Sequence, residues 1–198
     1  MVYLIKNKTE DRCTGLRPHC IQGDMYMKEA LIIIDVQNDY FEGGACELHR
    51  PREAEDRIIE LISESRGVGR PVIYIRHINP DDEPFFNEGT YGCEISDRIK
   101  PHPDDIVINK YCPNSFLGTE LNDCLRNLGV EKLIVCGMMT HMCVDTTVRA
   151  AMDHGYDVTL VADACATKDL EVNGEIIPAE TVQKTYIASL AGTFATIA

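Results

Sequence analysis

The sequence predicts a single α/β domain built on a mostly parallel six-stranded sheet with helices on both faces. The 198-residue chain has the length of one well-buried domain. Short apolar runs rich in β-branched residues recur along it, as expected for strands that are buried on both faces. Between them lie segments whose apolar residues repeat every three to four positions, which is the pattern of amphipathic helices.

The first strands and the first helix are predicted from such runs. Leu31–Ile34 is entirely apolar and is expected to be a central strand that ends at Asp35. Arg50–Arg66 places apolar residues on one side and charges on the other, which predicts a helix. Pro71–Ile75 is the next predicted strand, and His77 lies just past its end.

A long irregular stretch then precedes the third strand. Asn79–Pro103 is rich in Asp, Pro and Gly and carries Phe85, Phe86 and Tyr91. Long loops in compact domains are usually functional, so these aromatic residues are candidates for the walls of a pocket. The same residues also suit packing against the sheet or against a partner chain.

The third strand is expected at Asp105–Asn109 and is followed directly by Lys110. A helix is expected from about Thr119 to Leu128, because Thr119 is a suitable start signal and Gly129 a suitable stop signal.

The chain is organised around Leu133–Ala151, with the sequence LIVCGMMTHMCVDTTVRAA. Leu133–Cys136 is a predicted buried strand, which Gly137 interrupts. From Met142 onward the apolar spacing becomes helical, and Gly155 is placed to end this helix in a left-handed conformation.

The remaining elements are a strand at Asp157–Val161, a helix at Pro178–Ala191 and a last strand at Thr193–Ile197. Six strands that alternate with helices predict a Rossmann-like three-layer sandwich.

Composition excludes several classes of function. The chain is 44% apolar and 26% charged, as in ordinary globular proteins, and no apolar stretch approaches the roughly 20 residues needed to cross a bilayer. A net charge of −13 without a basic cluster argues against nucleic-acid binding. Nine cysteines without paired CxxC spacing indicate neither a disulfide framework nor a zinc ribbon. With no apparent signal peptide, a reduced, cytoplasmic protein is expected.

Residues 1–28 are expected to be an N-terminal extension or arm, with a short strand at Val2–Ile5. Cys13, His19 and Cys20 lie in this extension, but they lack a fourth ligand at a suitable spacing for a metal site.

Cys143 is the candidate nucleophile. A strand, a sharp turn and a helix place its thiol near a helix N-terminus, where free backbone N–H groups favour an anion. The thiol pKa is therefore expected to be low, and the same N–H groups suit a developing oxyanion. The alternative is a buried structural cysteine, which is the commoner role.

Asp35 and Lys110 follow strand ends at the same predicted edge of the sheet. Asp35 within reach of the thiol would take its proton and pass it to a leaving amine, and Lys110 would pair with the thiolate. A helix cap for Asp35 and an exposed surface position for Lys110 are the structural alternatives.

Cys112 is a weaker candidate thiol, since no helix begins at it. His77 is interpreted as a simply hydrogen-bonded strand-end residue, and His141 as a residue of the pocket mouth or of a subunit contact.

Three motifs in order resemble the isochorismatase-like cysteine hydrolases, a family that includes nicotinamidases and N-carbamoylsarcosine amidases. They are Asp35–Asp39 after a buried strand, Lys110 with Pro113–Phe116, and Gly137–Val144, and the resemblance covers roughly residue 28 to the C-terminus. It implies that residues 29–198 form the hydrolase domain, with an Asp35–Lys110–Cys143 triad. It also implies a cis peptide at Met138–Met139 and an oxyanion hole formed by the N–H groups of Met139 and Cys143.

Departures from the family pattern narrow the expected chemistry. Nicotinamidases carry an Asp-x-His and further metal-binding histidines after the second strand, whereas His77 is the one histidine here, so no metal and no other cofactor is expected. Isochorismatases proper lack the nucleophilic cysteine, so the presence of Cys143 favours cleavage of a C–N bond in a small amide, ureido or carbamoyl substrate. The alternatives are an ether or ester hydrolase that depends on Asp35 alone, and a non-enzymatic thiol-redox or binding protein.

The expected partner is a small-molecule substrate, and the resemblance implies a homodimer or homotetramer. The residues expected to bind substrate are Gln37, Phe41, Phe85, Tyr91, Phe116 and His141.

Overall fold

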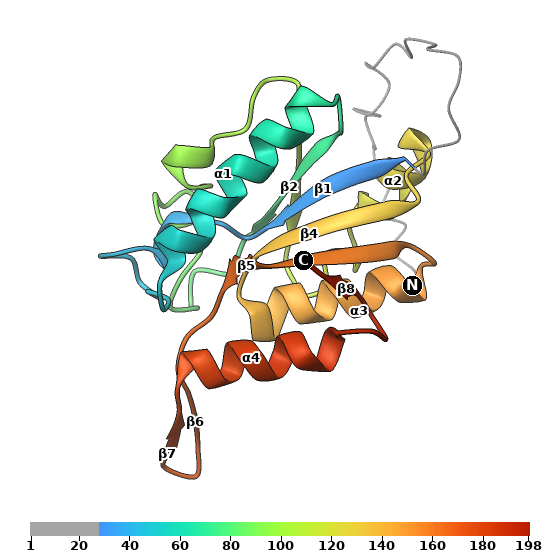
Figure 1. Ribbon diagram of the computed structural model, residues 1–198. Helices are drawn as coiled ribbons and strands as arrows, with labels where there is room; N and C mark the ends of the chain where they lie inside the picture. Colours follow the sequence, from blue (N-terminus) through green and yellow to red (C-terminus); the bar gives the residue numbers. More distant parts are fainter. Residues whose placement is uncertain (1–27) are drawn as a thin grey trace, which may run out of the picture.

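A computed structural model describes residues 28–198 as three layers, a twisted sheet between two layers of helices (Figure 1). The predicted Val2–Ile5 strand and the group Cys13, His19 and Cys20 lie outside the described residues. Within the described part, no helix combines the length and the apolar character that a membrane span requires.

The main sheet has six strands in the order β3-β2-β1-β4-β5-β8, and every neighbouring pair is parallel. The strands are β1 (Glu29–Ile34), β2 (Val72–His77), β3 (Ile106–Lys110), β4 (Lys132–Met138), β5 (Asp157–Ala166) and β8 (Thr196–Ile197). The predicted mostly parallel six-stranded sheet is therefore confirmed.

Four helices cover the sheet: α1 (Pro51–Gly67), α2 (Leu121–Leu128), α3 (Asp145–Asp153) and α4 (Ala179–Leu190). Helix α1 packs on one face, where Ile33 and Tyr74 join its apolar side. Helices α2, α3 and α4 pack on the other, where Ile32 and Ile75 contribute to a second apolar cluster. Alternate side chains of each central strand thus enter opposite clusters, which explains why these strands are apolar throughout.

Three features differ from the predicted elements. Strand β5 continues five residues past the predicted end at Val161, and the chain then forms a small antiparallel hairpin of β6 (Leu170–Val172) and β7 (Glu175–Ile177). The hairpin projects from the body of the domain (Figure 1). Only the last two residues of the predicted strand Thr193–Ile197 belong to β8.

The order of the strands reverses between β1 and β4. From β1 the chain proceeds outward to β2 and β3, and from β4 it proceeds the other way to β5 and β8. A crevice at the carboxyl ends of the strands beside such a reversal is where open α/β sheets bind ligands.

Candidate active site

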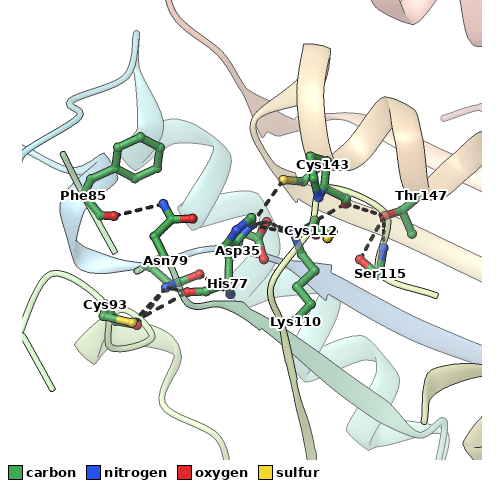
Figure 2. Close-up of polar contacts among 12 residues, drawn as sticks. Asp35, His77, Asn79, Phe85, Cys93, Lys110, Cys112, Ser115, Cys143 and Thr147 are labelled. Carbon is green, nitrogen blue, oxygen red and sulfur yellow. Dashed lines mark hydrogen bonds and ion pairs between the residues drawn. The ribbon is translucent and has the colours of Figure 1, made fainter. Parts of the chain in front are cut away.

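Asp35, Lys110 and Cys143 meet at this reversal (Figure 2). Asp35 follows β1 in a left-handed conformation with φ of 51°, which Asp tolerates better than most residues. Lys110 is the last residue of β3. Cys143 lies in a π-helical turn, Thr140–Val144, between β4 and α3. The predicted convergence of the three residues is therefore present.

The charged pair at the centre is completely buried. Lys110 Nζ lies 2.7 Å from Asp35 Oδ2, and neither side chain has exposed surface. The ammonium also donates to the carbonyl oxygens of Cys112 at 3.1 Å and Pro113 at 3.4 Å. Asp35 Oδ1 is buried and has no hydrogen-bond donor within residues 28–198. One carboxylate oxygen is thus occupied by the lysine, and the other can accept a proton.

His77 is hydrogen-bonded at the end of its strand, as expected, and it also belongs to the same cluster. Its Nδ1 lies 2.9 Å from Lys110 Nζ, 3.8 Å from Cys143 Sγ and 3.9 Å from Asp35 Oδ2. His77 ends β2, which lies between β1 and β3, so it carries the same strand-end signal as Asp35 and Lys110. That signal is the one by which the sequence could have placed His77 in the site.

The thiol of Cys143 does not have the low pKa expected from its place before a helix. Burial raises the pKa, and the negative charge of Asp35 raises it further, while Lys110 lowers it by a smaller amount. The expectation considered only the helix terminus, whereas desolvation dominates because Cys143 is only 4% exposed. The resting group is therefore a thiol.

The neighbouring cation and imidazole have opposite shifts. Burial alone would lower the pKa of Lys110, but the negative charge of Asp35 and the polar contacts with Asp35 and Cys143 outweigh burial, so the pKa is raised. Burial lowers the pKa of His77, and the nearby Lys110 lowers it further. At neutral pH the cluster therefore holds an ammonium and a neutral imidazole.

The donor set does not fit a resident metal ion. Ligand atoms of Asp35, His77 and Cys143 lie within 4.8 Å of one another, the single such group among the residues that the structure describes. However, the Lys110 ammonium contacts Asp35 Oδ2 and His77 Nδ1, so a metal cation there would have to approach a buried positive charge.

Two segments hold the strand ends together. Ser115 donates its backbone N–H to Thr147 Oγ1 at 3.1 Å, and the two hydroxyl groups lie 2.8 Å apart, which fixes the loop after Lys110 against α3. In the turn after β4, Thr140 Oγ1 donates to Gln183 Oε1 at 2.6 Å. The Met138–Met139 peptide of that turn is cis, as the resemblance implied.

Aromatic rings stand beside His77. The rings of Phe86 and His77 are 6.2 Å apart, and Phe86 also packs on Phe85 at 4.9 Å and Tyr40 at 4.6 Å. The Phe86 N–H donates to the buried Asp39 Oδ2 at 2.8 Å, which fixes the position of the ring. Phe85 thus belongs to the cluster beside the site, and Phe86 is the ring of that cluster that is paired with His77.

Gln37 and Phe41, which the sequence predicts to bind substrate, are both buried against other parts of the protein. The Gln37 amide is buried and bonds to backbone groups of His77 and Cys93. Phe41 is buried under the guanidinium of Arg52, 4.2 Å from the ring centroid. Both residues support the structure around the site.

Tyr91 and Phe116 also lie elsewhere. Tyr91 is 68% exposed, and its hydroxyl donates to Asp97 at the surface. Phe116 packs on His154 and Tyr156 at the C-terminal end of α3.

His141 remains a candidate for the pocket mouth. It is half-buried, and its Nδ1 lies 2.5 Å from Thr167 Oγ1, next to the Cys143 turn.

Comparison with known proteins agrees with this geometry. The family model described as the isochorismatase domain matches residues 29–197. The isochorismatase family protein YddQ of Bacillus subtilis is 44% identical over 86% of this chain and 96% of its own length. The crystal structure of an isochorismatase hydrolase of Oleispira antarctica has a TM-score of 0.86 at 36% identity, covering 89% of this chain and 96% of that chain.

A more distant relative is named for its reaction. The ureidoacrylate amidohydrolase RutB of Pantoea ananatis is 27% identical over 80% of this chain and 76% of its own length. Family model, relatives and fold agree: the chain belongs to the isochorismatase-like hydrolase family.

Proposed function

We propose that the protein is a metal-independent cysteine hydrolase that cleaves a C–N bond of a small amide, ureido or carbamoyl substrate. The observation that carries this proposal is the buried Lys110–Asp35 ion pair beside the Cys143 thiol. Carboxylate, ammonium and thiol in one water-poor pocket provide a base, a charge stabiliser and a nucleophile. The relative named as an amidohydrolase supports the choice of bond.

In the first half-reaction, Cys143 Sγ attacks the carbonyl carbon while its proton passes to Asp35. The unoccupied Oδ1 of Asp35 suits this transfer. The backbone N–H groups of Met139 and Cys143 would bind the developing oxyanion, and Lys110 offsets the negative charge near the sulfur. Asp35 then gives the proton to the leaving nitrogen as the C–N bond breaks, which leaves a thioester on Cys143.

In the second half-reaction, water attacks the thioester carbon and gives a proton to Asp35. The C–S bond breaks, the acid product leaves, and the proton returns from Asp35 to the sulfur. Because the resting thiol has a raised pKa, its deprotonation is coupled to the attack, and Asp35 acts as a base in both halves.

The test is turnover of a panel of small amides, ureas and carbamates by the wild type and by Cys143→Ala. The variant is expected to fold normally and to lose turnover, because removal of a nucleophile that forms a covalent intermediate abolishes that route. Acid quench of the wild type followed by mass spectrometry is expected to show an acyl adduct on the peptide with Cys143. Full activity of the variant would refute the proposal.

Ether or ester hydrolysis is the second candidate, because the matching family model is that of the isochorismatase domain. That chemistry would depend on Asp35 and would survive Cys143→Ala, so adding small ethers and esters to the panel lets the same variant separate the two. A thiol-redox role is disfavoured, since the thiol with a raised pKa reacts slowly with oxidants.

We also propose that the protein assembles as a homodimer or homotetramer. Light scattering is expected to give two or four times the 22.2 kDa of one chain, and a monomer at that mass would contradict this.

A further inference from the structure

We infer that His77 is a positioning residue of the proposed centre, a neutral acceptor that holds the Lys110 ammonium between Asp35 and Cys143. This inference rests on the proposed function for its kinetic consequences only. The hydrogen bond between His77 Nδ1 and Lys110 Nζ does not depend on which reaction the protein catalyses.

The first argument is the number of hydrogen bonds that Lys110 can make. An ammonium has three hydrogens and no acceptor. Three acceptors lie within 3.1 Å of Nζ: Asp35 Oδ2 at 2.7 Å, His77 Nδ1 at 2.9 Å and the carbonyl oxygen of Cys112 at 3.1 Å. The Pro113 carbonyl oxygen at 3.4 Å is a fourth and more distant acceptor, so without His77 one buried N–H of Lys110 would keep only this longer bond.

The second argument is charge. Because Lys110 donates to Nδ1, the neutral ring carries its proton on Nε2. A neutral acceptor fixes the ammonium without adding negative charge beside the sulfur. A carboxylate at the same place would compete with Asp35 for the cation and oppose formation of the thiolate.

The third argument is that the buried side chain of Gln37 holds the backbone of His77 in place. Gln37 Oε1 accepts from the His77 N–H at 2.8 Å, and Gln37 Nε2 donates to the His77 carbonyl oxygen at 2.8 Å. The same Nε2 donates to the Cys93 carbonyl oxygen at 2.7 Å. Gln37 is fully buried, so these bonds fix the imidazole relative to Lys110.

The groups that face the imidazole come from each neighbouring element. Asp35 follows β1, Lys110 ends β3, and Cys143 lies in the turn after β4. Asn79 hydrogen-bonds the ring from the following loop, where Phe86 packs beside it. Cys93 Sγ contacts the His77 carbonyl oxygen at 3.6 Å.

A first experiment needs no substrate. Nuclear magnetic resonance of the ¹⁵N-histidine-labelled protein is expected to show His77 as a neutral Nε2–H tautomer at pH 7. A proton on Nδ1, or a charged ring, would overturn the inference whether or not the protein cleaves amides.

The second experiment compares His77→Asn, His77→Asp and His77→Leu on an amide found in the panel. Asn places a neutral acceptor near the position of Nδ1, Asp is the same size with a negative charge, and Leu offers no acceptor. His77→Leu and His77→Asp are each expected to lose at least about tenfold in kcat with little change in KM, as for loss of a buried hydrogen bond. His77→Asn is expected to recover most of the kcat lost in His77→Leu.

Equal losses of kcat in His77→Asn and His77→Leu would overturn the inference, because they would show that a hydrogen-bond acceptor at this position does not matter. An unchanged kcat in His77→Leu would also overturn it. If His77→Leu fails to fold, the size-matched Asn and Asp variants still decide: a kcat for Asn at least about tenfold above that for Asp supports the role, and equal values contradict it.

Discussion

At the scale of single residues, Asp35 and Lys110 act on Cys143 in opposite directions. The carboxylate raises the pKa of the thiol, and the ammonium lowers it. Asp35 must remove the proton of the thiol, yet its own negative charge disfavours the thiolate that results. The reactivity of the thiol toward simple alkylating reagents and its reactivity toward substrate therefore depend on Asp35 in opposite ways.

Asp35→Asn is expected to change these two reactivities in opposite directions. Loss of the negative charge lowers the thiol pKa, so alkylation of Cys143 by iodoacetamide at pH 7 is expected to become faster. Loss of the proton acceptor is expected to reduce kcat by about 10²- to 10⁴-fold. Alkylation is measured by mass spectrometry and kcat with a substrate from the panel.

Asp97→Asn is the control, because this carboxylate is 53% exposed and pairs with Lys100 at the surface. It is expected to change neither rate. Slower alkylation in Asp35→Asn would show that the charge of Asp35 does not control the thiol.

Gln37→Glu is expected to destabilise the fold by about 1–3 kcal/mol. The Gln37 amide donates to two buried carbonyl oxygens, and a carboxylate would bring further acceptors to both. Urea unfolding measures the loss. Asn38→Asp makes the same chemical change at an exposed hydrogen bond to the Tyr91 carbonyl oxygen, and is expected to cost less than about 0.5 kcal/mol. Equal costs would show that Gln37 is not a buried clamp.

The three residues of the proposed triad could be found from the sequence because each follows or ends a strongly apolar strand. A parallel sheet brings such ends to one edge, whatever the loops do. The directions of side chains in loops carry no such signal. The burial of the Gln37 amide and the packing of Phe116 on His154 therefore could not be predicted, although both residues lie in the motifs that carry the family resemblance.

At the scale of elements, the turn after β4 depends on close contact between two strands. Gly137 has φ of 127°, and a Cβ at this position would overlap the backbone oxygen of Ile34 in β1. Residues 34 and 137 are paired in the ladder, and the Asp35 and Cys143 segments leave from this point. Glycine here lets the two strand ends that carry the base and the nucleophile approach each other.

Gly137→Ala is therefore expected to destabilise the protein by more than about 3 kcal/mol, since backbone strain and overlap add. Gly155→Ala is the matched control. Its φ is 88°, but no atom lies within 4 Å of the added Cβ, so only the strain of about 1 kcal/mol is expected. Thermal and urea unfolding compare the two. Similar losses would show that the contact with Ile34 has no importance.

The long elements could be predicted from their periodicity, with ends within a few residues of those observed. The hairpin of β6 and β7 could not, because its strands have three residues each and are largely exposed, so no apolar alternation marks them. The sequence likewise does not distinguish the π-helical turn around Cys143 from the start of a regular helix, because both place apolar residues on one side.

At the scale of the whole molecule, two apolar clusters enclose the sheet and the site lies at the end of the strands that separate them. Burial of the sheet gives the low-polarity surroundings in which an ion pair and a neutral imidazole can persist. The same burial makes the stability of the fold depend on pH, because groups kept neutral inside can take up protons once the chain unfolds.

Acidification from about pH 7.5 to about pH 5.5 is expected to lower the free energy of unfolding. The pKa values of His77 and His141 are both lowered from 6.5, with burial as the main cause. Below 6.5 the unfolded chain therefore binds more protons than the folded protein, and stability is lost as pH falls toward the folded pKa values. The slope is at most about 1.4 kcal/mol per pH unit for each proton, and the half-exposed His141 contributes the smaller share. In urea unfolding, the double variant His77→Asn and His141→Asn is expected to flatten this slope. A slope that persists in the double variant would place the responsible protons on other groups.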